Sequence, residues 1–110
     1  MEQVYNKLVR DNIPDIISSN NEVPFTRFLN DNEYREELYK KLLEECNEVV
    51  NSKSSEEVLE ELADVFEVME SIVKLENKSF DDVKDIAISK KNKRGGFEKR
   101  IYLEKVLTDK

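Results

Sequence analysis

Apolar residues recur every three or four positions through the middle of the chain, which is the period of an amphipathic helix. Both prolines lie in the first quarter of the sequence, and the two glycines are adjacent at 95–96. No residue that breaks a helix therefore interrupts the stretch between them. We predict helices over residues 32–51, 55–77 and 80–93.

Two sequence signals mark where helices begin. Ser54 with Glu57, and Ser79 with Asp82, have the spacing of capping boxes. The connections before these two serines are short, so consecutive helices should be antiparallel neighbours.

The ends of the chain are less regular. We expect residues 4–17 to be extended or turn-rich, residues 25–29 to form a short helix, and residues 97–106 to allow a short strand. The fold class predicted is all-α, an antiparallel bundle of about four helices with an extended N-terminal segment. Residues 1–110 would form a single domain, since this length is typical of one.

Composition removes several classes of protein. The net charge is −7 and 39% of the residues are charged. No apolar run is long enough to span a membrane, and the N-terminus lacks an apolar signal segment, so a cytoplasmic location is expected. With one cysteine and no histidine, any bound metal should be a hard, oxygen-liganded ion such as Mg²⁺ or Mn²⁺.

The charge is unevenly distributed. Residues 33–76 hold 14 acidic and 5 basic side chains, whereas residues 90–100 hold six basic side chains and one acidic. This pattern is typical of a solvated acidic bundle with a basic tail, but it also suits a metal-collecting centre beside an anion-binding segment. The acidic balance argues against nucleic acid as the partner.

Acidic side chains border the apolar faces of two predicted helices. At about 100° per residue, Glu45 falls at the edge of one apolar stripe and Glu48 just outside it, whereas Glu61 and Asp64 fall beside another stripe. Glu45 and Glu61 stand at the same level on either side of the connection. Carboxylates near apolar surface need either cationic partners or a divalent ion. The nearby lysines, at 40, 41 and 74, are not expected at this level.

The second of these helices has an apolar arc wider than one neighbour covers. A second copy of the chain is the simplest cover, so we predict a homodimer or homotetramer. Cys46 lies on the stripe of the first helix and is interpreted as a core residue.

Three blocks of sequence carry a resemblance to a known family. Residues 44–48 and 60–64 resemble the E-x-x-E and E-x-x-D signature of the MazG-like all-α nucleoside triphosphate pyrophosphatases. Residues 5–14 and 93–97 look like the start and end of a phosphoribosyl-ATP pyrophosphohydrolase-like subgroup. The resemblance implies Mg²⁺-dependent cleavage between the α and β phosphates of a nucleotide, in some members a non-canonical one. By matching positions, the metal ligands would be Glu45, Glu48, Glu61 and Asp64.

Further roles are hypotheses. Glu48 could also orient the attacking water. Basic residues could hold the substrate phosphates, with Arg94 the first choice because a guanidinium can bind phosphate in a bidentate manner; the others are Lys7, Arg10, Lys90 and Lys93. The alternative function is a non-catalytic helical module, binding or regulatory, whose acidic residues form salt bridges between subunits.

Overall fold

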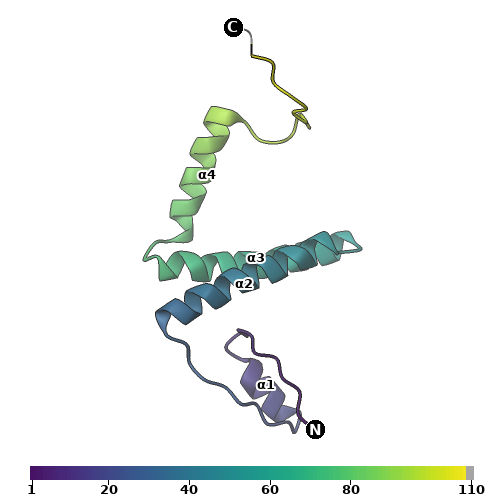
Figure 1. Cartoon of the computed structure of the whole chain (residues 1–110), viewed down its shortest axis with the longest axis vertical. Coiled ribbons are helices and arrows are strands. Elements are labelled where there is room, and N and C mark those ends of the chain that lie inside the picture. The colour runs from purple at the N-terminus through teal and green to yellow at the C-terminus, as the bar shows by residue number, and fades with distance from the viewer. Residues whose placement is uncertain (109–110) are drawn as a thin grey trace. The chain divides into compact units, whose positions relative to one another are not determined.

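The computed structural model describes residues 1–108 and is all-α, as predicted (Figure 1). Its helices are α1 (Ile13–Ser19), α2 (Asp31–Val50), α3 (Ser55–Leu75) and α4 (Phe80–Arg94). Residues 97–106 form no strand, so the short strand considered there is wrong. Nothing in the described chain is long and apolar enough to cross a membrane as a helix.

The chain divides into two compact units. One contains Met1–Ser79, and the other begins at Phe80. The first unit is built on α2 and α3, which pack against each other and run antiparallel because a short turn joins them (Figure 1). The second contains α4, which has no buried side chain. The assignment of all 110 residues to one functional domain stays a prediction.

The start of α2 is fixed by a complete capping box. The Asn30 side chain accepts a hydrogen bond from the Glu33 backbone N–H at 2.9 Å, and Glu33 accepts one from the Asn30 N–H at 3.3 Å. The backbone at Asn30 is extended, with ψ 173°. The short helix predicted for residues 25–29 does not form, since this segment leads in extended form to the cap.

The N-terminal segment also differs from its prediction. Residues 13–19 are helical instead of extended. Pro14 occupies the first turn of α1, where a missing N–H costs nothing and the fixed φ favours a helix. Proline was therefore an initiator of this helix and did not prevent it.

Left-handed residues follow the ends of α3 and α4. After α3, Asn77 has φ 60°, and the N–H groups of Asn77 and Lys78 donate to the carbonyls of Lys74 and Val73. This is a Schellman motif. Gly95, with φ 82°, follows α4 as the sequence predicted.

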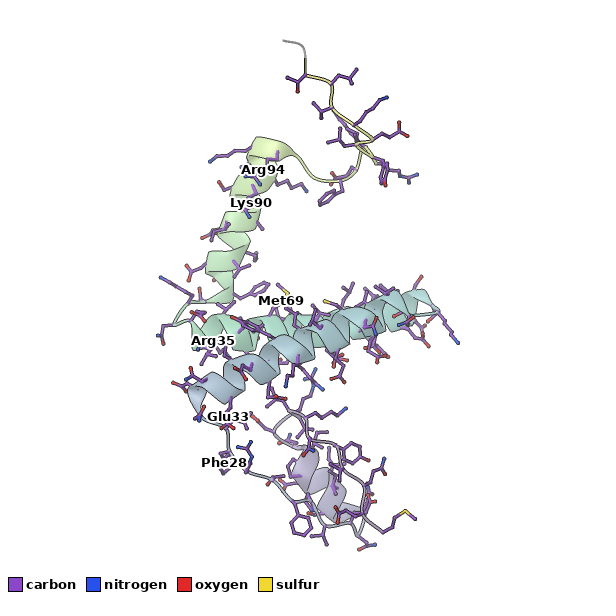
Figure 2. The ribbon with its side chains drawn as sticks, viewed as in Figure 1. Phe28, Glu33, Arg35, Met69, Lys90 and Arg94 are labelled. Atoms are coloured by element: carbon purple, nitrogen blue, oxygen red, sulfur yellow. The ribbon has the colours of Figure 1, made fainter. Side chains whose placement is uncertain are left out.

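The core of the described chain is small. Only Leu38 and Val68 are buried among the apolar residues, with 3% and 7% of their surface exposed. Other apolar residues remain in solvent; Phe28, in the segment before α2, extends fully away from the chain (Figure 2). Cys46, which we expected in the core, is exposed.

Candidate metal centre

Three carboxylates meet where α2 packs on α3. Glu45 comes from α2, and Glu61 and Asp64 lie one turn apart on α3. One oxygen from each lies within 4.8 Å of the others, and all three side chains are partly buried. The antiparallel packing brings them together because Glu45 and Glu61 are at similar distances from the connecting turn.

Glu48, the fourth predicted ligand, is not part of this group. It lies one turn closer to the end of α2 and is exposed. Its negative charge nevertheless raises the pKa of both Glu45 and Glu61. We call Glu45, Glu61 and Asp64 the acidic triad and treat Glu48 as a neighbour of it.

Burial and mutual repulsion raise the pKa of two members. Partial burial is the main cause for the Glu45 carboxyl, followed by the charge of Asp64, while Lys41 opposes both. For Glu61, burial is again the main cause of the raised pKa, followed by the charges of Asp64, Glu48 and Glu45. The folded chain therefore holds more negative charge here than it accommodates well, and a proton or a cation would relieve it.

Two cations of the chain supply part of that relief. Arg10 Nη2 lies 2.7 Å from Asp64 Oδ1, and Lys41 Nζ lies 3.7 Å from Glu45 Oε1. The expectation that no lysine would reach this level is wrong for Lys41. Residues four apart share a helix face, so its spacing from Glu45 could have revealed the contact. Arg10 is 54 residues from Asp64 in sequence, and no local pattern predicts their contact.

Glu61 differs from the other two members. Within residues 1–108, no lysine or arginine nitrogen lies within 4.0 Å of its carboxylate. Two cations therefore face three triad carboxylates, with the charge of Glu48 added nearby. The local balance stays negative.

The predicted phosphate-binding cations fall into two groups. Lys7 and Arg10 precede α1 and lie beside acidic residues; Lys7 Nζ is 3.5 Å from Glu44 Oε1, a carboxylate that Lys41 also contacts at 3.6 Å. Lys90, Lys93 and Arg94 are exposed on the C-terminal part of α4, in the unit that begins at Phe80 (Figure 2). Their role toward phosphate stays a prediction.

The donor set suits a hard divalent cation. Carboxylate oxygens are the ligands of Mg²⁺ and Mn²⁺, and Mg²⁺ usually keeps several waters beside a few carboxylates. Neighbouring ligands of an octahedral Mg²⁺ are about 3.0 Å apart and opposite ones about 4.2 Å, as follows from bonds of about 2.1 Å. The triad oxygens lie within 4.8 Å of one another, so the three side chains would have to move closer together to share one ion.

Comparison with protein-family models, with curated proteins and with solved structures finds no match.

Proposed function

We propose that the protein is a Mg²⁺-dependent nucleoside triphosphate pyrophosphohydrolase, which cleaves between the α and β phosphates to give a monophosphate and pyrophosphate. The observation that carries the proposal is the acidic triad. Its members belong to the two motifs, residues 44–48 and 60–64, that resemble the MazG-like signature. Mn²⁺ would substitute for Mg²⁺ at such a site.

Each member of the site has a proposed role. Glu45, Glu61 and Asp64 would hold the cation. Bound there, the cation would neutralise phosphate oxygens and stabilise the leaving pyrophosphate. Glu48 is exposed beside the triad, so its carboxylate can reach solvent and orient the attacking water.

Water is the nucleophile that suits this chain. The sequence has no histidine to serve as a base, and its one cysteine is not among the triad residues. Positively charged side chains would bind the phosphates that the cation leaves unneutralised. In this proposal they are Lys7 and Arg10, from the N-terminal segment of the unit that holds the triad. A phosphate-binding role for Lys90, Lys93 and Arg94 of α4 stays a prediction.

The proposed active form is a homodimer or homotetramer. Leu59, Leu62 and Phe66 of α3 retain 69%, 46% and 44% exposure in the single chain. Such a face is covered in most stable proteins. A second copy would cover it without another gene product.

A second candidate is supported by the ion pairs. Arg10 with Asp64 and Lys41 with Glu45 neutralise part of the triad within one chain. In a non-catalytic helical module, acidic residues would serve only such pairs, within or between subunits. The pyrophosphatase proposal accounts better for Glu61, whose carboxylate has no such pair within residues 1–108.

The test is a panel of canonical and non-canonical triphosphates, incubated with the protein and Mg²⁺ and assayed for pyrophosphate. We expect release from at least one nucleotide, abolished by EDTA. Glu61→Gln should reduce the rate by about a hundredfold or more, because it removes a charged ligand.

The matched control is Glu67→Gln, an exposed glutamate of the same helix outside the triad. It should keep the wild-type rate within about twofold, as a surface change does. No pyrophosphate from any nucleotide, together with no stabilisation by metal, would favour the non-catalytic module.

A further inference from the structure

The N-terminal segment places two cations on the two central helices. Arg10 contacts Asp64 of α3, and Lys7 contacts Glu44 of α2, although only three positions separate the two cations. Residues 7–10 thus bridge α2 and α3 at the level of the acidic triad. Both pairs are exposed: 58% of the Arg10 side chain and 44% of the Lys7 side chain remain in solvent.

We propose that Arg10 is a partner-exchanging residue: it neutralises Asp64 while no metal is bound, and it moves to an anionic ligand when a divalent cation takes its place. This inference rests on the proposed metal centre and concerns its regulation. Arg10 makes the shorter of the two ion pairs to the triad, since its Nη2 lies 2.7 Å from Asp64 Oδ1, whereas Lys41 Nζ lies 3.7 Å from Glu45 Oε1.

The weakness of the pair makes the exchange feasible. Ion pairs that solvent reaches contribute at most about 1 kcal/mol, so a bound cation can displace Arg10 at a penalty of up to about fivefold in affinity. The displaced guanidinium remains tethered beside the site. Because it no longer bonds to Asp64, it can then donate two hydrogen bonds to a phosphate group.

Lys7 provides a matched comparison. Its partner Glu44 is also contacted by Lys41, at 3.6 Å, so Glu44 keeps a cation when Lys7 is removed. Glu44 is not a triad member. Removal of Lys7 should therefore change metal binding far less than removal of Arg10.

The exchange predicts effects of opposite sign from one substitution. Arg10→Ala should bind Mn²⁺ alone up to about fivefold more tightly than wild type, because no internal cation competes. The same variant should bind inorganic triphosphate, in the presence of Mn²⁺, about tenfold more weakly, because a charged donor is lost. If Arg10 had a purely structural role, its removal would not strengthen Mn²⁺ binding and at the same time weaken triphosphate binding.

The experiment is calorimetric titration of wild type, Arg10→Ala, Arg10→Lys and Lys7→Ala with Mn²⁺, then with inorganic triphosphate. Lys7→Ala should stay within about twofold of wild type for Mn²⁺ alone. Arg10→Lys should fall between wild type and Arg10→Ala, because it keeps the charge without the planar fork.

The outcomes separate the two proposals. If Mn²⁺ binds but Arg10→Ala binds it no more tightly, or if triphosphate affinity is unchanged, the exchange is overturned and the metal centre stands. If neither wild type nor Arg10→Ala binds Mn²⁺, the metal centre is wrong and the exchange falls with it. Circular dichroism of each variant would check that its helices are intact.

Discussion

The α2–α3 pair has two ends with different electrostatics. At the end away from the connecting turn, Arg35 Nε of α2 lies 3.2 Å from Glu76 Oε1, directly after α3 (Figure 2). We call this the open end. Nearer the turn, the acidic triad gathers three carboxylates, and within residues 1–108 the cations in contact with them are Arg10 and Lys41.

The difference shows what distinguishes a structural ion pair from a candidate site. At the open end one arginine pairs with one carboxylate, so the two charges of this pair balance each other. At the triad, burial first and the neighbouring carboxylates second raise the pKa of Glu45 and Glu61, so the charged forms of both side chains are unfavourable there. Such concentration of unfavourable charge is typical of functional positions.

Both ends depend on the same small core, so the largest effect should come from Leu38. Leu38→Ala should lower the free energy of unfolding by about 2–5 kcal/mol, because it opens a cavity at one of the two buried apolar positions. Urea denaturation measures this. Leu43→Ala, at an exposed position of the same helix, is the control and should change the free energy by about 0.5 kcal/mol or less.

If Leu38→Ala and Leu43→Ala were equally mild, α2 and α3 would not depend on this core. Equal and large losses would instead indicate that Leu43 is covered in solution, as a second copy of the chain would do.

The second prediction is that Mn²⁺ stabilises the protein through the triad and not through the open end. At a Mn²⁺ concentration of 100 times Kd, wild type should gain about 2.7 kcal/mol of stability. Glu61→Gln should lose most of that gain, whereas Glu76→Gln, at the open end, should keep it. Thermal unfolding with Mn²⁺ and with EDTA measures the gain. Equal gains in both variants would place the metal outside the triad.

These contrasts also show how far the sequence could lead. The helices over residues 31–50, 55–75 and 80–94 follow from period, caps and the absence of breakers. The level of Glu45 against Glu61 follows from their distances to the turn. The N-terminal helix was missed because Pro14 was interpreted as an interruption, although proline in the first turn favours a helix.

The counterions of the triad were harder to predict. Arg10 reaches Asp64 from a distant segment, and only the folded chain brings them together. Cys46 lies on the predicted apolar stripe yet remains exposed, because a pair of helices covers less surface than a complete bundle. Periodicity identifies which face is apolar, but it does not say what covers that face.

The third prediction concerns pH in metal-free buffer. The raised pKa values of Glu45 and Glu61 mean that the folded state binds their protons more tightly than the unfolded state. The free energy of unfolding should therefore fall as pH rises through these pKa values. The destabilisation by the two charged carboxylates should be complete at neutral pH. The double variant Glu45→Gln/Glu61→Gln should be more stable than wild type at pH 7.

Urea midpoints from pH 7 down to about 4.3, the ordinary value for glutamate, test this. The advantage of the double variant should shrink steadily as wild type takes up its two protons. Glu33 should not disturb the difference. Its pKa is lowered by the hydrogen bond from Arg27, and this pair is present in both proteins. A constant difference across this range would show that the triad is not strained by charge.

The smallest effects should come from the arginines at the two ends. Arg35→Ala and Arg10→Ala each remove one solvent-exposed pair, so each should lower stability by at most about 1 kcal/mol in EDTA, and less at high salt. Saturating Mn²⁺ should cancel the loss in Arg10→Ala, since the metal then neutralises Asp64, but it should leave the loss in Arg35→Ala unchanged. Urea midpoints of both variants with Mn²⁺ and with EDTA measure this. A loss of stability in Arg10→Ala that persists with Mn²⁺ would mean that Mn²⁺ does not replace Arg10 at the Asp64 carboxylate. The Arg10–Asp64 pair would then be as unresponsive to metal as the Arg35–Glu76 pair.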